Sequence, residues 1–377
     1  MGMRGQRPAL AVAALLSFVT IVVSGGRADA VTPSTRWHGT FSARMTVNAG
    51  SDANGSWPKR NYYVYVPPTL PAAGTRSLVV YLHGTSQTAI DAANGVLWND
   101  LADKEHFIVM YPEEATAAES GDSLDGSSDS RGWSWGQAAE YGRGSGEMRT
   151  IAEMTQRVIA NYGADPRRVF IGGASAGAIM ATVMGATYPD MYAAVASWAG
   201  CDYMCVDPTG VLGYQRMGAY ARVVPSILFS GSLDYVVNPA LGVTQITGLV
   251  AMNDLADDGK PDGSVSLRPT SGPTNHGLTL ANLKPGPHPV ITDNGCHYSN
   301  AASNACPAGW LDWKTYPYTV TKWGYRTHHN DVVIESWIIH GMTHNYSGGV
   351  PEGSYVDPFG PDTTVPAWRF FQAHPRR

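Results

Sequence analysis

The segment Val169-Phe170-Ile171-Gly172-Gly173-Ala174-Ser175-Ala176-Gly177 decides the fold of this 377-residue chain. Its first residues form an apolar run that predicts a buried strand, and residues 176–187 predict a helix that begins directly after it. The turn between strand and helix is so tight that the positions two before and two after Ser175 must be small, and glycine stands at both. Such a turn lifts the serine hydroxyl above the edge of a sheet.

Short apolar strands and helical segments alternate along most of the chain. We expect an edge strand at 62–66 and buried strands at 77–82, 107–111, 193–197, 226–230 and 332–339. The strand at 107–111 should stop at Pro112. Helices are expected at 98–104 and at 150–162, where Gly163 ends the second helix. This alternation predicts an α/β fold, with a mostly parallel central sheet and helices on both faces.

The composition excludes several classes of protein. Charged residues make up 15% of the chain and hydrophobic residues 44%, as in a globular protein that buries a sizeable core. The formal net charge is only −5 and no run is rich in Lys and Arg, so we expect no nucleic-acid partner. No stretch after the N-terminal region is long and apolar enough to span a bilayer.

The first 30 residues have the pattern of a signal peptide. Arg4 and Arg7 form a positive region, residues 9–23 are apolar without a charge, and Ala28-Asp29-Ala30 matches a cleavage site. The apolar run is short for the alternative, a membrane anchor, which needs roughly 20 residues. The pattern predicts a secreted protein that keeps no membrane attachment once residues 1–30 are removed.

The four cysteines are expected to form disulfides, because an exported chain meets an oxidising compartment. Cys201 and Cys205 are close in sequence, as are Cys296 and Cys306, and pairing within each couple is the simplest of the possible connectivities. The alternative is a zinc site, but these cysteines lack the C-x-x-C spacing. We therefore expect no bound metal, and no other cofactor is needed.

The serine turn indicates nucleophilic catalysis, in which a serine hydroxyl needs a base. In this type of turn the partners follow in the order Ser, acid, His. Asp234 comes shortly after the strand at 226–230, which makes it the candidate acid. Two residues could be the base, since His340 ends the last strand and His344 lies in the loop beyond it. A loop suits a side chain that must reach Ser175, so we favour His344.

Two backbone N–H groups are expected to stabilise an oxyanion. One belongs to Ala176, at the start of the helix after the serine. The other should come from the loop His83-Gly84-Thr85-Ser86-Gln87, which follows a predicted strand, and we assign it to Thr85. His83 is interpreted as a buried histidine that braces this loop and is not assigned as a base.

Residues 238–330 interrupt the alternation of strands and helices. They are rich in Gly, Pro, Asn and aromatic residues, and a structureless loop of that length would be unusual in a compact domain. We predict an insertion over the active site, within a single catalytic domain that spans 31–377. Trp133 and Trp135 are expected to flank the cleft and bind substrate, although aromatic residues also serve as packing.

Taken in order along most of the mature chain, these residues resemble a known family. The chain is similar to the poly(3-hydroxybutyrate) depolymerase family of esterases, which is close to carbohydrate esterase family one and implies the α/β-hydrolase fold. The stretches that carry the resemblance are Leu82-His83-Gly84-Thr85-Ser86-Gln87-Thr88-Ala89, Trp133-Ser134-Trp135, Arg143-Gly144-Ser145-Gly146-Glu147, Asp165-Pro166-Arg167-Arg168-Val169, Gly173-Ala174-Ser175-Ala176-Gly177-Ala178-Ile179-Met180-Ala181, Gly341-Met342-Thr343-His344 and Trp368-Arg369-Phe370-Phe371.

The resemblance implies that Ser175 is the nucleophile, Asp234 the acid and His344 the base of a carboxylic ester hydrolase. The Arg-Gly-x-Gly-Glu stretch is more typical of the depolymerase-like branch than of feruloyl esterases. The chain also departs from the family, whose members usually have cysteines at the positions of Thr85 and Gly132. Both cysteines are absent together, which fits the loss of one disulfide.

The expected function is that of a secreted, monomeric serine esterase that works through an acyl-enzyme. Short-chain esters and soluble 3-hydroxybutyrate oligomers are the expected substrates. Attack on crystalline polymer should be weak, because the sequence lacks the separate substrate-binding domain that polymer depolymerases commonly carry. The alternatives are a feruloyl or acetylxylan esterase that uses the same residues, and a non-catalytic binding protein on the same fold.

Overall fold

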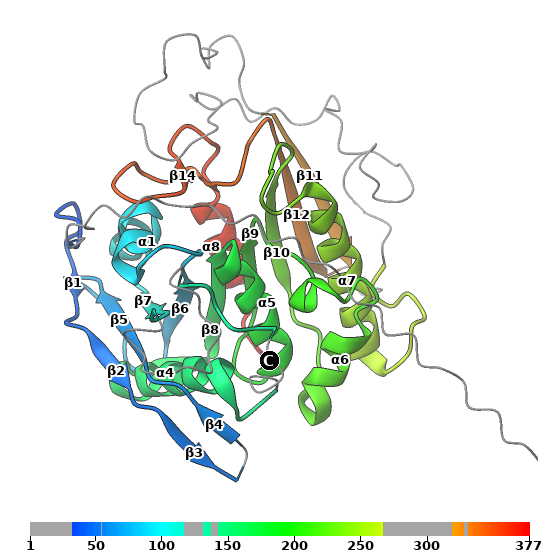
Figure 1. Cartoon of the computed structure of the whole chain (residues 1–377), viewed down its shortest axis with the longest axis horizontal. Helices are drawn as coiled ribbons and strands as arrows, with labels where there is room; N and C mark the ends of the chain where they lie inside the picture. Colours follow the sequence, from blue (N-terminus) through cyan, green and yellow to red (C-terminus); the bar gives the residue numbers. More distant parts are fainter. Residues whose placement is uncertain (1–31, 54, 117–130, 137–141, 267–318, 328–330) are drawn as a thin grey trace, which may run out of the picture. The chain divides into compact units, whose positions relative to one another are not determined.

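A ten-stranded sheet forms the centre of the fold (Figure 1). Its main path follows the order β1 (Thr40–Phe41), β5 (Arg60–Val66), β7 (Ile108–Glu113), β6 (Arg76–Leu82), β8 (Ala164–Ala174), β9 (Val195–Trp198), β10 (Ser226–Gly231), β12 (Val332–His340) and β11 (Thr319–Arg326), and β2 (Met45–Val47) pairs with β5. Every neighbouring pair from β7 to β12 is parallel, whereas β1, β2, β5 and β11 join in antiparallel fashion. The predicted mostly parallel sheet is confirmed.

The computed structural model describes residues 32–377 except 54, 117–130, 137–141, 267–318 and 328–330. Thr32 to Arg377 belong to one compact unit. The predicted signal peptide and the predicted Cys296–Cys306 disulfide lie outside the described residues. Within the described ranges, no helix combines the length and the apolar character that a membrane span requires.

The two faces of the sheet bury two separate apolar clusters. Along β6, Leu78, Val80 and Leu82 point into one cluster, and Val79 and Tyr81 point into the other. The first cluster includes residues of α4 (Gly146–Tyr162), α5 (Ala176–Thr187), α6 (Val211–Met217) and α7 (Pro239–Asp258), and the second includes residues of α1 (Ala89–Gly95), α2 (Trp98–Glu105) and α8 (Thr364–Ala373). Helices therefore cover both faces of the sheet, as predicted.

Several short elements complete the domain. β3 (Gly50–Asp52) and β4 (Gly55–Trp57) form an antiparallel pair, and β13 (Tyr346–Ser347) and β14 (Val356–Asp357) form a parallel pair. The 3₁₀ turns η2 (Tyr203–Cys205) and η3 (Gly218–Tyr220) lie before and after α6. The predicted Cys201–Cys205 disulfide is confirmed, and it closes the segment that contains η2.

Two expectations about the strands are wrong. β7 does not stop at Pro112 but continues to Glu113, and Pro112 lies opposite Tyr62 of β5. The parallel pairing of β7 with β6 ends at Met110, so the missing N–H of the proline removes no hydrogen bond on that side. β5 is not an edge strand, because the short strands β1 and β2 pair with it.

The segment predicted as an insertion, 238–330, includes two regular elements of the domain. α7 buries Ile246, Leu249 and Val250 in the first apolar cluster. β11 is antiparallel to β12 at the end of the main sheet. The helix gave no clear periodic signal because apolar residues occur on most of its sides, as expected for a helix covered on more than one side. The predicted position of the insertion over the active site concerns residues 267–318, which lie outside the described residues.

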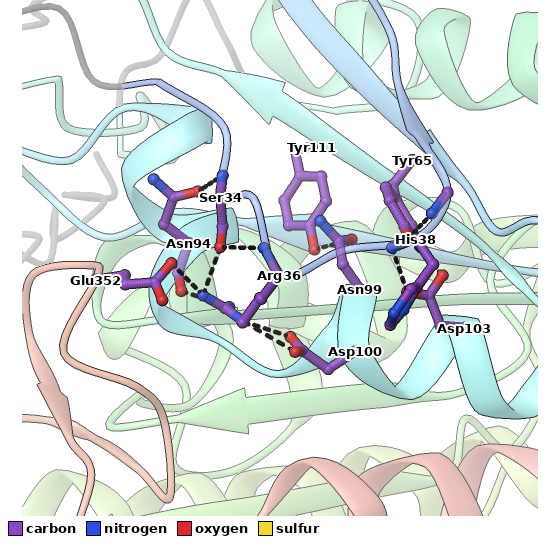
Figure 2. Close-up of polar contacts among 11 residues, drawn as sticks. Ser34, Arg36, His38, Tyr65, Asn94, Asn99, Asp100, Asp103, Tyr111 and Glu352 are labelled. Atoms are coloured by element: carbon purple, nitrogen blue, oxygen red, sulfur yellow. Dashed lines mark hydrogen bonds and ion pairs between the residues drawn. The ribbon is translucent and has the colours of Figure 1, made fainter.

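A cluster of polar contacts attaches the first described residues to the rest of the domain (Figure 2). The Arg36 guanidinium contacts Asp100 of α2 at 2.9 Å and the carbonyl oxygen of Asn94 of α1 at 2.7 Å. It also pairs with Glu352 at 2.5 Å. Glu352 belongs to the loop between β13 and β14, so Arg36 joins this loop to α1 and α2.

Stacked aromatic rings hold α8 against the second face of the sheet. The Phe371 ring lies 4.7 Å from the Phe170 ring of β8 and 5.9 Å from the Trp98 ring of α2. Trp368 stacks on Phe107, with 4.0 Å between ring centroids. Because β8 leads directly to Ser175, the C-terminal helix supports the strand that carries the serine turn.

Phe371→Ala should lower the free energy of unfolding by about 3–5 kcal/mol, because it opens a cavity between Phe170 and Trp98 that these rings cannot fill. Urea unfolding followed by tryptophan fluorescence measures the change. Val211→Ala, at an exposed position on α6, is the control and should change the free energy by less than about 0.5 kcal/mol. Equal effects of the two substitutions would contradict the role given to the aromatic stack.

Candidate active site

Ser175 occupies a strained turn between β8 and α5. The helix spans Ala176–Thr187, as predicted, and Ser175 has a φ of 54° and a ψ of −122°. A positive φ is unfavourable for any residue with a Cβ atom and persists only where the surrounding structure determines it. A Cβ atom at Gly177 would lie 2.1 Å from the carbonyl oxygen of Leu82, and one at Gly173 would lie 2.5 Å from the Gly177 backbone. The requirement for small residues on both sides of Ser175 is therefore a property of the folded structure.

Asp234 and His344 are in direct contact. The Nδ1 atom of His344 lies 2.8 Å from Oδ2 of Asp234. The second oxygen of Asp234 accepts hydrogen bonds from the N–H groups of Val236 and Val237 at 2.9 and 2.8 Å. Since an ionised carboxylate only accepts, Nδ1 carries the proton and Nε2 has the free lone pair of a base. Asp234 is 5% exposed, so solvent weakens this contact little.

The three residues follow the ends of neighbouring strands. Ser175 follows β8, Asp234 follows β10 and His344 follows β12, and these strands stand in the order β8-β9-β10-β12. Parallel strands present their carboxyl ends at one edge of the sheet, so the fold brings the three loops to the same side.

Backbone contacts fix the loops of Asp234 and His344 against each other. The N–H of Leu233 donates to the carbonyl oxygen of Met342 at 3.0 Å, and the N–H of Gly341 donates to the Ser232 hydroxyl at 2.9 Å. A Cβ atom at Gly231 would lie 2.4 Å from the Met342 carbonyl oxygen, so only glycine allows this approach. The candidate acid and the candidate base are thus held together by main-chain contacts as well as by their own hydrogen bond.

His340, the other candidate base, is placed differently. It is the last residue of β12, opposite Thr319 of β11, and it is 7% exposed. Burial lowers the pKa of its imidazole. The carboxylate of Asp234 contacts His344, which lies beyond the turn at Gly341. Of the two histidines that the sequence left open, His344 is the one that contacts the carboxylate of the candidate acid Asp234.

The loop that should supply the second oxyanion donor packs on the serine turn. A Cβ atom at Gly84 would lie 3.5 Å from the Cβ atom of Ser175. The N–H of Gly84 donates to Oε1 of Gln87 at 2.9 Å and is therefore occupied. Thr85 is exposed, and Ser86 has a positive φ of 68°. The predicted donor, the N–H of Thr85, belongs to the residue directly after Gly84, whose own N–H is bonded to Gln87.

His83 braces this loop from the inside, as its interpretation as a buried residue requires. Its Nδ1 lies 2.8 Å from the Gly84 carbonyl oxygen, and its Nε2 accepts a hydrogen bond from the N–H of Glu114 at 2.9 Å. The ring is therefore neutral, with the proton on Nδ1. Burial lowers the pKa of His83 to about 4.

The structure places the two predicted substrate-binding tryptophans at different depths. Trp133 is 4% exposed, and its indole N–H donates to the carbonyl oxygen of His83 at 2.8 Å. Trp135 is half-buried and packs against the first apolar cluster. In this position Trp133 supports the loop of Thr85 from below. A substrate contact for either tryptophan stays a prediction.

A buried ionic cluster lies behind the loop, and the sequence did not reveal it. The Nε atom of Arg60 lies 2.7 Å from Glu114 and 2.7 Å from Glu147, and all three side chains have no exposed surface. Burial opposes the charge of Arg60, but the charges of Glu147 and Glu114 outweigh burial and raise its pKa. Burial, followed by the charge of Glu147, raises the pKa of Glu114 well above its usual value.

This cluster is connected to the loop through two routes. The N–H of Glu114 holds Nε2 of His83, and Oε2 of Glu147 accepts the N–H of Ser134, the neighbour of Trp133. Glu147 closes the Arg-Gly-x-Gly-Glu stretch, which the sequence offered only as a family motif. The sequence signal that could have identified Arg60 as the partner of Glu147 is the presence of an arginine in β5, whose other inward-facing residues are apolar. Among the described residues, no group of three or more His, Cys, Asp or Glu side chains is arranged to hold a metal ion.

His83 should make stability depend on pH. Its pKa is about 4 when folded and about 6.5 when unfolded, so the unfolded chain binds the extra proton as the pH falls through this interval. Relative to His83→Gln, the wild type should lose about 2 kcal/mol of unfolding free energy between pH 7 and pH 5. Urea unfolding of both proteins at the two pH values measures this difference, in which the other titrating groups largely cancel. Parallel pH dependences would show that His83 is not buried in the neutral form.

The chain is similar in sequence to known esterases. The family model described as Esterase PHB depolymerase matches residues 60–257. Poly(3-hydroxyalkanoate) depolymerase C of Paucimonas lemoignei is 35% identical over 197 residues, which are 47% of this chain and 45% of the relative. Acetylxylan esterase A of Talaromyces purpureogenus is 34% identical over 164 residues, which are 44% of this chain and 38% of the relative. The chain thus spans less than half the length of these curated relatives.

A solved structure supports the fold over a larger part of the chain. The acetyl xylan esterase from Aspergillus awamori superposes with a TM-score of 0.50 at 18% identity, and the match covers 88% of this chain and 100% of that one. At this identity the likeness concerns the fold alone, and it agrees with the α/β-hydrolase arrangement of sheet and helices. Because the family model matches more than half of the sequence, the chain belongs to the Esterase PHB depolymerase family.

Proposed function

We propose that this chain is a serine esterase that hydrolyses carboxylic esters through an acyl-enzyme. The observation that carries the proposal is the 2.8 Å contact between His344 and Asp234, at the same edge of the sheet as the strained turn of Ser175. In this reading Ser175 is the nucleophile, His344 the base and Asp234 the acid that orients the base and stabilises its charged form. Family membership supports the same class of chemistry.

The first half of the reaction forms the acyl-enzyme. The Ser175 oxygen attacks the carbonyl carbon of the ester while its proton passes to Nε2 of His344. The negative charge that develops on the carbonyl oxygen is stabilised by the N–H groups of Ala176 and Thr85. The N–H of Ala176 suits this purpose because the first N–H groups of a helix have no acceptor within the helix. Collapse breaks the ester C–O bond, and His344 returns the proton to the departing alcohol.

The second half releases the acid. Water attacks the acyl carbon and gives a proton to His344, and the bond to the Ser175 oxygen breaks as that proton returns to the serine. Asp234 keeps the base in place throughout, since one of its oxygens contacts His344 and the other accepts the N–H groups of Val236 and Val237. The cycle needs no cofactor.

We propose 3-hydroxyalkanoate-type esters as substrates, with short-chain esters and 3-hydroxybutyrate oligomers as the nearest tests. Similarity to poly(3-hydroxyalkanoate) depolymerase C supports this choice. Acetylated xylan is the second candidate, because acetylxylan esterases of several fungi match the chain with almost equal identity. The signal-peptide pattern of residues 1–30 supports export as part of the proposal.

Ser175→Ala and His344→Ala should each lower kcat on p-nitrophenyl butyrate by roughly 10⁴-fold or more, because each removes a member of one catalytic unit. His340→Ala should keep most of the activity of the wild type. Circular dichroism at matched concentration checks that all three variants are folded. Loss of activity in His340→Ala with activity kept in His344→Ala would reverse the assignment of the base. Full activity in Ser175→Ala would favour a non-catalytic protein with a contaminating hydrolase.

The purified protein should hydrolyse soluble 3-hydroxybutyrate oligomers faster than acetylated xylan or methyl ferulate. The measurement is the initial rate of acid release on the three substrates at equal ester concentration, with Ser175→Ala as the blank. High rates on acetylated xylan or methyl ferulate, with none on the oligomers, would replace the proposed substrate and leave the mechanism as it stands.

A further inference from the structure

Four large apolar side chains are exposed around the candidate site. Leu233, Tyr235 and Val236 flank Asp234 in sequence and are 60%, 67% and 50% exposed. Tyr355, in the segment between β13 and β14, is 41% exposed. We call these four residues the apolar rim. Soluble proteins seldom leave several large apolar side chains together in water, and such groups frequently mark a binding site.

The backbone of the Asp234 loop directs the three side chains of this loop outward. Its polar groups are used inside, since the N–H groups of Val236 and Val237 hold Asp234 and the N–H of Leu233 holds the Met342 carbonyl oxygen. The same bonds position the candidate acid. The exposed side chains are therefore carried by backbone that the site itself fixes, and they do not belong to a loosely held surface loop.

Tyr355 is held in an unfavourable conformation. Its φ is 56°, in the left-handed region that bulky residues rarely adopt. The backbone on both sides of its Cα atom is fixed, because the N–H and the hydroxyl of the preceding Ser354 bond to the Asp91 carboxylate, and the carbonyl oxygen of Tyr355 itself accepts the N–H of Tyr346 at 2.8 Å. Strain that the surroundings maintain is concentrated at functional sites.

The residues that hold Tyr355 also hold the predicted oxyanion loop. The Gln87 amide donates to Asp91 at 3.0 Å and to the Ser354 carbonyl oxygen at 2.9 Å, while its own oxygen accepts the N–H of Gly84 at 2.9 Å. The position of Tyr355 is thus set relative to the loop of Thr85. Burial, followed by the charge of Asp91 and the phenol of Tyr235, raises the pKa of Tyr355.

We propose that the apolar rim is the subsite that binds the aliphatic chain of the ester, next to the bond that is cleaved. The proposal rests on the proposed function and selects its substrate class, an ester with a chain of several carbons, such as a hydroxyalkanoate oligomer. The aliphatic side chains of Leu233 and Val236 can bury methyl and methylene groups of such a chain. The fixed backbone means that this subsite needs little ordering when the substrate binds.

The test compares kcat/KM on p-nitrophenyl hexanoate and p-nitrophenyl acetate. Burial of one methylene group corresponds to about a fourfold change in binding, so loss of a rim side chain should lower the hexanoate-to-acetate ratio by about 5- to 20-fold. The variants are Leu233→Ala and Tyr355→Gly. Glycine accepts a positive φ, so Tyr355→Gly should unfold at the same temperature as the wild type or higher, and its loss of preference cannot be attributed to misfolding.

Leu212→Ala is the matched control, because Leu212 is an exposed leucine of α6 and lies outside the loops of the site. It should keep the wild-type ratio and hydrolyse both esters within about twofold of the wild type. A ratio that stays unchanged in Leu233→Ala and Tyr355→Gly, or that falls equally in Leu212→Ala, overturns the subsite alone. A wild type that hydrolyses neither ester overturns the proposed function, and the subsite with it.

Discussion

The close approach of two backbone segments next to Ser175 is the constraint on which the rest of the structure depends. At Gly177 a side chain would meet the carbonyl oxygen of Leu82 at 2.1 Å, so the start of α5 passes the end of β6 without any side chain between them. This contact keeps Ser175 at a positive φ that a free chain would leave. It also places the loop after β6 directly over the serine turn, because the same strand continues into His83 and Gly84.

Buried side chains behind the loop fix its position over the serine turn. Replacement of any one of them alone would leave another without its partner. His83 and Trp133 contact each other and the loop backbone. Arg60 connects Glu114, whose N–H bonds to His83, with Glu147, which accepts the N–H of Ser134. A buried ion cluster of this kind adds little net stability compared with apolar packing, and removal of one member leaves an uncompensated charge. Its effect is geometric, since it holds the loop of the proposed oxyanion donor in one position.

The fold and the order of the chemical groups were largely predictable from the sequence. The apolar runs at 77–82, 226–230 and 332–339 gave their strands because buried parallel strands have a short, continuous apolar pattern. The glycines around Ser175 predicted the turn, because the need for small residues there depends only on positions close in the sequence. α7 and the full length of β7 were not predictable in the same way, because a helix with apolar residues on most sides has no stripe and a proline is tolerated where one neighbouring strand has ended.

The sequence by itself determined the serine turn, the alternation that builds the sheet and the order in which Ser175, Asp234 and His344 occur. These features follow from the periodicity of apolar residues and from the small residues of one turn, and both can be recognised from positions that are close in the sequence. Only the tertiary structure decided that Asp234 contacts His344 and that Arg60 lies between Glu114 and Glu147. It alone decided that Tyr355 is exposed and strained beside the loop of Thr85. Such contacts join residues far apart in the chain, and burial and charge pairing depend on which residues the folded sheet brings together.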